Sequence, residues 1–191
     1  MNYHKEKKAN RRHIWVSFIS SFFLLFFAIK VSLSELPDKG SITEIKGVLK
    51  DIKIKKGRRS KTLIINLNEY PEINFMIGDL ELNQSALYDL MNGNKLGDSI
   101  IFFIEKHEYY RKIVKSEKIP FPVNFLYKKN IDIVEIHNRN IEYLSLNNYN
   151  NAHRNNNYLA IAVLGFFGLL MLLAGIKGIK GIKYYKANFS K

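Results

Sequence analysis

Hydrophobic and polar positions divide the chain into three parts. Uncharged apolar residues fill positions 14–29 and 158–176, and a long stretch of mixed polarity separates them. The second run has 19 residues, and about 20 are needed for a helix to cross a hydrocarbon core of ~30 Å. The first run reaches about 20 residues when Lys30 extends its ammonium group to the membrane surface and residues 31–33 continue the helix. The pattern therefore predicts two transmembrane helices, 14–33 and 158–176.

The first apolar segment also has the order of a cleavable signal peptide. A basic start precedes it, and Ser32 and Ser34 form a small-residue cleavage pattern behind it. The apolar stretch is slightly longer than in most signal peptides, and serine is a less favoured cleavage residue than alanine. An uncleaved anchor is the preferred prediction, and cleavage is the alternative.

Residues between the two spans alternate as expected of β-strands. In 42–55 the pattern places Val48, Ile52 and Ile54 on one face and charged side chains on the other. Strands are expected at 42–55, 61–67, 72–77, 100–104, 131–136 and 141–146, the last two forming a hairpin. The predicted fold class is a membrane protein whose two transmembrane helices flank a mainly-β soluble domain, a β-barrel or rolled sheet with one short helix.

The one short helix is expected between the third and fourth strands. Asn83 is a favourable N-cap, and Leu82 and Leu87 are spaced as a hydrophobic staple around it. Gly93 stands where a helix-ending glycine belongs. These signals predict a helix that begins after Asn83 and ends before Gly93.

Seven asparagines crowd positions 147–157, just before the second span. The preferred interpretation is a solvated juxtamembrane linker, and the alternative is a helical extension of the span whose amides bind a neighbour. The expected organisation is then a basic cytoplasmic tail, a span, an extracytoplasmic β-domain with its linker, a second span and a second basic tail. Their bounds are 1–13, 14–33, 34–157, 158–176 and 177–191.

The net charge of +13 is concentrated beside the two apolar segments. Residues 1–13 carry a net +4 and residues 177–191 a net +5. Basic residues next to a span favour the cytoplasmic side, so both termini are predicted to be cytoplasmic. The central domain is then extracytoplasmic, in the periplasm or outside, and the protein lies in the inner (plasma) membrane. Lysine outnumbers arginine by 23 to 7, a bias typical of A/T-rich bacterial genomes, so nucleic acid is not expected as a partner.

Recognisable catalytic motifs are missing from the sequence. It has no cysteine, so disulfides, thiolate metal sites and cysteine nucleophiles are excluded. The stretch from His107 begins like a zinc-protease helix but carries Arg111 where the second histidine must bind. No catalytic residue, cofactor or metal is therefore predicted, and the protein is expected not to be an enzyme. A membrane-bound hydrolase with a site assembled only on folding is the remaining enzymatic alternative.

The most distinctive polar feature is a basic hairpin between the first two strands. Six cations lie within nine residues: Lys53, Lys55, Lys56, Arg58, Arg59 and Lys61. They could bind anionic lipid, an anionic envelope polymer or an acidic partner. The alternative is a solvated tip whose charges protect an edge strand from aggregation.

Small residues in the second span suggest a helix-packing face. Ala162, Gly165 and Gly168 recur at intervals of three, which would let the first span or a partner helix approach closely.

The whole chain resembles bacterial two-span membrane proteins whose extracytoplasmic insert is a small β-domain. The resemblance rests on the order of spans and strands, on Gly-Asp-Ser-Ile at 97–100, and on Tyr-Leu-Ser-Leu-Asn-Asn-Tyr-Asn at 143–150. It implies architecture and no activity. The predicted function is a non-enzymatic membrane-anchored interaction or accessory protein, either a subunit of an envelope complex or a neutralising partner. Membrane lipid and either a protein partner or a second copy are the expected contacts, and lipid or polymer binding by the basic hairpin is the alternative.

Overall fold

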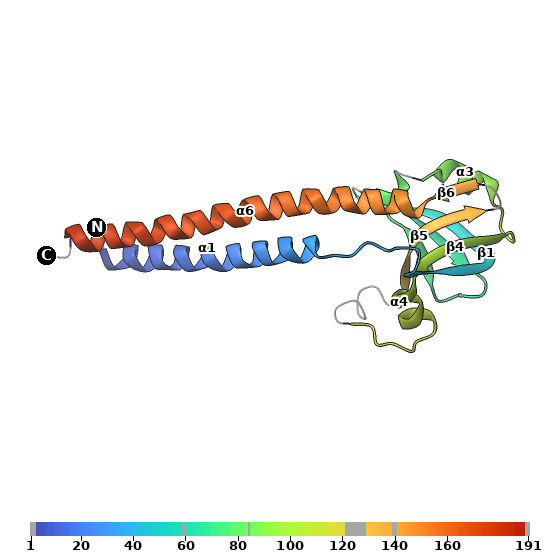
Figure 1. Ribbon diagram of the computed structural model, residues 1–191, viewed down its shortest axis with the longest axis horizontal. Helices are drawn as coiled ribbons and strands as arrows, with labels where there is room; N and C mark the ends of the chain where they lie inside the picture. Colours follow the sequence, from blue (N-terminus) through green and yellow to red (C-terminus); the bar gives the residue numbers. More distant parts are fainter. Residues whose placement is uncertain (1–2, 59, 84, 121–128, 139–140, 190–191) are drawn as a thin grey trace. The chain divides into compact units, whose positions relative to one another are not determined.

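The computed structural model describes residues 3–58, 60–83, 85–120, 129–138 and 141–189. The chain forms two compact units (Figure 1). One combines Met1–Glu35 with Asn155–Lys191, and the other is Leu36–Arg154. The first is called the helical unit below and the second the barrel unit.

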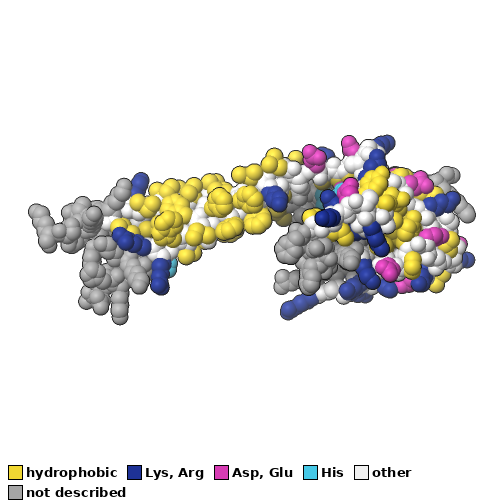
Figure 2. Space-filling view, turned by 90° about the horizontal axis from the view of Figure 1, so that it is seen from below, with side chains coloured by type: hydrophobic (Ala, Val, Ile, Leu, Met, Phe, Trp, Pro, Cys, Tyr) yellow, Lys and Arg dark blue, Asp and Glu magenta, His cyan; other side chains and the backbone are white. Residues whose placement is uncertain are grey.

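Two long helices make up the helical unit. Helix α1 spans Tyr3–Ser32, and helix α6, Leu146–Phe189, belongs to this unit from Asn155 onward. Each contains a stretch long and apolar enough to cross a membrane, Arg11–Ser32 in α1 and Leu146–Ile182 in α6. Hydrophobic side chains cover most of the visible face of this unit (Figure 2). The sequence therefore located both apolar helices.

The described residues of the barrel unit form a six-stranded sheet in the order β3-β2-β1-β4-β5-β6, part of which can be followed in Figure 1. All neighbours in this order are antiparallel, and a parallel pairing of β3 with β5 closes five strands into a barrel. This connectivity is that of a five-stranded Greek-key barrel of the OB type, a fold that assigns no function by itself. The strands are β1 Ile42–Lys56, β2 Lys61–Leu67, β3 Asn74–Ile77, β4 Ser99–Glu105, β5 Asn130–Asn138 and β6 Ile141–Leu144.

The barrel interior is filled by the inward side chains of the alternating strands. Phe75 and Phe102 meet at its centre, with ring centroids 4.8 Å apart. Fully buried aliphatic side chains surround them, among them Leu63, Ile65 and Ile133. A small barrel of this kind is packed with side chains and is not a channel, so ligands must approach it from outside.

A β-bulge in β1 changes which side chains face the core. The register shifts between Leu49 and Asp51, so that Lys50 is an extra residue on this strand. The predicted inward face began with Val48, but Leu49 is buried and Val48 only half-buried. The prediction of strict alternation was wrong here because the extra residue switches which alternate side chains of the strand face the core.

Two short helices replace the single one predicted between β3 and β4. Helix α2 spans Asp79–Leu82 and helix α3 spans Leu87–Gly93. Asn83 ends α2 instead of starting the helix, and Gly93 lies inside α3. The Asn94 side chain donates a hydrogen bond of 2.7 Å to the Leu90 carbonyl. That amide satisfies an end carbonyl of the helix, so no helix-ending glycine is required.

A short helix, α4 (Lys106–Glu108), and a π-helical turn, η1 (Tyr109–Ile113), follow β4. Apart from the zinc-protease-like start at His107, the sequence carried no helix signal here, because the eight residues of these two turns are too few for a visible 3.6-residue period.

The asparagine-rich segment 147–157 is helical and not a linker. Helix α6 begins at Leu146, and Tyr149 and Ala152 of its first turns are buried in the barrel unit. The Asn150 side chain donates a hydrogen bond of 2.8 Å to the Pro37 carbonyl of the same unit. Burial of one helix face outweighs the weak helix propensity of asparagine, and this is the alternative of helical extension.

Candidate functional site

The basic hairpin lies at the turn between β1 and β2. Its described cations are all exposed, and Arg59 lies outside the described residues. Lys53 forms an ion pair of 2.7 Å with Asp51. The Gly57 N–H donates a hydrogen bond of 2.7 Å to the Ser60 carbonyl and closes the turn. The structure thus places the described cations of the hairpin on one solvent-exposed tip.

Strand register places two cations of this tip directly opposite each other. Lys56 of β1 pairs with Lys61 of β2. Like charges in directly opposed positions of an antiparallel pair are destabilising. An anion bound at the tip would remove that repulsion.

A second basic feature, which the sequence analysis missed, is a recess beside η1. Its volume is about 350 Å³. The β2–β3 loop, residues 70–73, forms one wall, and Arg111, Lys112, Lys115 and Lys129 contribute cations. These residues are far apart in sequence and meet only because β3 pairs with β5, so no local motif could have revealed them.

Lys112 differs from the other cations of this recess because it is buried as well as paired. Its side chain is buried and forms an ion pair with Glu108 of α4. Its ammonium group also donates a hydrogen bond of 2.6 Å to the Asn130 carbonyl. Lys112 therefore ties η1 to β5. Arg111 forms an ion pair with Glu117 at 3.5 Å, and the recess keeps Lys115 and Lys129 for other partners.

A polar cluster on the outside of the barrel joins α2, β5 and the first turns of α6. Buried Glu81 forms a hydrogen-bonded ion pair with His153, whose ring stacks on Tyr149 with centroids 4.3 Å apart. Asp132 retains solvent-accessible surface, but neighbouring protein crowds its carboxylate. That partial desolvation, and secondly the charge of Glu81, raise the pKa of Asp132 above its usual value.

In the part of the chain that the structure describes, no group of three or more histidine and acidic side chains is placed to hold a metal ion. His107, the residue that begins the zinc-protease-like stretch, instead contacts Glu105 at 3.1 Å and Glu108 at 3.4 Å.

The predicted small-residue face of α6 is only partly the face that meets α1. A Cβ atom added at Gly168 would lie 2.8 Å from Leu25 of α1, so glycine is required for this approach. Gly165 has open space at that position, and Ala162 is exposed. The contact continues instead at Gly175 and Gly178, where an added Cβ would lie 3.1 Å from Phe18, a tight contact, and 2.6 Å from Ile14, a collision.

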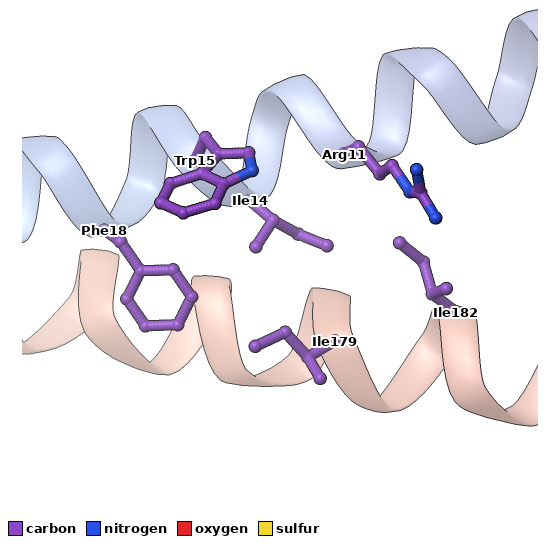
Figure 3. Close-up of a pocket in the computed structure, with 6 residues that line it drawn as sticks. All are labelled: Arg11, Ile14, Trp15, Phe18, Ile179 and Ile182. Carbon is purple, nitrogen blue, oxygen red and sulfur yellow. The ribbon is translucent and has the colours of Figure 1, made fainter.

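An apolar groove of about 460 Å³ lies between α1 and α6 in the helical unit (Figure 3). Ile14, Trp15 and Phe18 of α1 and Ile179 and Ile182 of α6 line it, and the Arg11 side chain lies at one end. Apolar walls with one guanidinium group match an acyl chain beneath an anionic headgroup.

Comparison of the chain with protein-family models, curated proteins and solved structures finds no match. The resemblance to two-span bacterial proteins therefore stays a prediction, and function has to be inferred from the geometry alone.

Proposed function

We propose that this is a non-enzymatic, membrane-anchored interaction or accessory protein. It crosses the inner membrane twice, keeps both termini in the cytoplasm and holds the barrel unit on the outer side. There the barrel binds another envelope protein, as a subunit of a complex or as a neutralising partner.

The observation that carries this proposal is the contrast between the two units. The helices expose large apolar side chains, such as Phe22 (66 % exposed) and Leu173, along much of their length. The strands of the barrel bury most of their apolar side chains in the interior, and only some apolar side chains of that unit, such as Tyr88 and Leu96, are exposed. Exposed apolar surface as extensive as that of the helices calls for a non-aqueous surrounding, whereas a barrel with a buried apolar core suits water.

The distribution of charge supports the orientation. Basic residues near the start of α1 and the end of α6, including Arg11, Arg12, Lys177 and Lys180, are exposed. Cations at these ends favour retention on the cytoplasmic side and contact with anionic headgroups.

Single cysteines test the orientation cleanly because the natural chain has none. Lys95→Cys in the barrel unit should react with a membrane-impermeant maleimide in cells with a permeabilised outer envelope. Lys177→Cys should react only after the inner membrane is lysed. Labelling in the reverse order would overturn the proposed topology.

Site-specific photocrosslinking in cells tests the interaction. A crosslinking residue at Arg58, on the basic hairpin, should capture one dominant envelope protein. The control is Tyr88, which is 80 % exposed on α3 and should capture none. Only lipid and self-crosslinks from Arg58 would contradict a protein partner at the hairpin.

A second candidate function is binding of anionic lipid or an envelope polymer by the basic hairpin. The opposed lysines of β1 and β2 favour it, because a polyanion relieves their repulsion. Reversing Arg58, Arg59 and Lys61 to glutamate should abolish binding to anionic vesicles. The matched control reverses three exposed lysines elsewhere in the barrel, Lys46, Lys50 and Lys95. Equal binding by the wild type and the hairpin variant would dismiss this function.

A further inference from the structure

We propose that the recess beside η1 binds a small phosphate-type anion. This site is distinct from the basic hairpin, which precedes β2, whereas loop 70–73 of the recess follows it. A seven-residue strand separates the two features by ~20 Å. The proposal also goes beyond the proposed function and does not depend on the orientation in the membrane.

The first argument is an unsatisfied donor. The Nε atom of Arg111 is buried and has no hydrogen-bond partner among the described residues. The guanidinium group forms an ion pair with the Glu117 carboxylate at 3.5 Å, but this contact is not a hydrogen bond and leaves the Nε donor unsatisfied. Buried donors are almost always paired, and a guanidinium group presents its N–H donors in a planar fork that fits phosphate oxygens.

The second argument is backbone strain at Lys115. Its φ angle is +60°, a left-handed conformation that glycine adopts readily and lysine does not. The turn is held by two hydrogen bonds, from the Val114 N–H to the Tyr109 carbonyl at 3.0 Å and from the Ser116 N–H to the Tyr110 carbonyl at 2.9 Å. Strain of this kind is concentrated at functional positions. Lysine at a position where glycine would fit the backbone better points to a use of the lysine charge in binding.

The third argument is the charge balance of the recess. Among the described residues, Lys112 is paired with Glu108 and Arg111 with Glu117, so Lys115 and Lys129 are the lining cations whose charge is left for a ligand. Glu72 is the acidic side chain of the lining. The four lining cations exceed the three acids Glu72, Glu108 and Glu117 by one positive charge, which favours an anion, and the apolar lining, Ile73 and Ile113 included, can hold the attached organic part.

The test uses the full chain in nanodiscs of zwitterionic lipid, titrated with inorganic pyrophosphate by calorimetry. Saturable binding is expected. Lys115→Gly should weaken it about tenfold, the value of one charge-assisted contact, and should leave the thermal unfolding midpoint equal or higher because strain is relieved. Arg111→Lys, which keeps the charge but removes the fork, should also weaken binding.

The matched control is Lys118→Gln, an exposed lysine three residues from Lys115 that does not line the recess. It should change affinity by less than about twofold. Equal losses in the Lys118 and Lys115 variants would overturn the proposal, since they would indicate attraction to general surface charge.

A second arm distinguishes a soluble ligand from a lipid headgroup. The nanodisc-held proteins are mixed with separate vesicles that contain phosphatidic acid. Vesicle binding that Lys115→Gly weakens and Lys118→Gln does not, in the absence of pyrophosphate binding, assigns the site to a headgroup phosphate. Binding to neither probe refutes the site, and the topology and crosslinking tests are unaffected by that result.

Discussion

The Glu81–His153 pair offers the sharpest test of how the first turns of α6 are held in the barrel unit. Glu81 is only 7 % exposed, and the His153 side chain is 30 % exposed. His153→Ala removes the cation and leaves a buried carboxylate without its partner. The same change removes the ring that stacks on Tyr149.

The expected loss in the free energy of unfolding follows from the burial of Glu81 and His153. Breaking a fully buried ion pair costs about 3–5 kcal/mol, and an exposed pair is worth about 0–1 kcal/mol. Because His153 keeps some solvent contact, an intermediate loss of about 2 kcal/mol is expected for the pair. Loss of ring stacking adds about 0.5–1.5 kcal/mol. The total of about 3 kcal/mol is a large part of the stability of an ordinary domain.

A double-mutant cycle separates the charge from the packing. Glu81→Gln retains the size and hydrogen-bonding capacity of the side chain without its charge. The loss caused by His153→Ala should therefore fall to about 1 kcal/mol in the Glu81→Gln background, because no buried charge is stranded.

Hydrogen exchange followed by mass spectrometry, on the full chain in detergent micelles, measures the opening free energies of α2, β5 and residues 146–154. His153→Ala should lower the protection of all three segments together. A loss below about 0.5 kcal/mol, the range of an ordinary surface substitution, would refute the argument, as would equal losses in both backgrounds of the cycle.

Three further predictions address the helices, the polar cluster and the hairpin. Gly168→Val should push α6 away from α1 and lower the yield of a disulfide engineered between the two helices. Gly165→Val should leave that yield unchanged, since a Cβ atom at this position meets open space. The raised pKa of Asp132 means that its ionised form is less favourable in the folded state than in the unfolded state. Its contribution to the stability of the fold is therefore fully present below the unfolded pKa of 3.8 and is lost as pH rises through the folded pKa. Asp132→Asn should thus unfold at a higher temperature than the wild type at neutral pH and at the same temperature below pH 3.8; a difference of the opposite sign would contradict the assigned desolvation. Lys61→Gln should stabilise the barrel by about 0.2–1 kcal/mol in denaturant unfolding while weakening any anion binding at the hairpin, and a loss of stability would show that the opposed lysines do not repel each other.

Strand positions could be predicted from the sequence where one face of a strand is buried without interruption. Residues 61–67 alternate strictly, and Leu63, Ile65 and Leu67 are all buried as expected. The alternation failed at Val48 because a bulge depends on the partner strand and leaves no mark in the strand itself. Helix boundaries failed at Asn83 for a similar reason. The Ala86 N–H donates to the Tyr143 carbonyl of β6 at 2.8 Å, and this distant contact decides where α3 begins.

The candidate sites could likewise be predicted from the sequence only where their residues are neighbours along the chain. The basic hairpin was visible in the sequence because its cations are neighbours along the chain. The recess was not, because Arg111 and Lys129 converge with loop 70–73 only after β3 and β5 have paired. The contact face of α6 was found at Gly168 but missed at Gly175 and Gly178, since a glycine pattern alone does not say where the neighbouring helix lies.

The sequence by itself determined the two apolar helices, the β-character of the segment between them and the concentration of cations at the hairpin. These properties arise from runs and periods of neighbouring residues, and burial of apolar side chains acts on them locally. Only the tertiary structure decided the closure of the barrel, the recess beside η1 and the pairing of Glu81 with His153. Each of these joins residues that are distant in the chain, and such contacts form only when the whole barrel offsets the entropy of bringing them together.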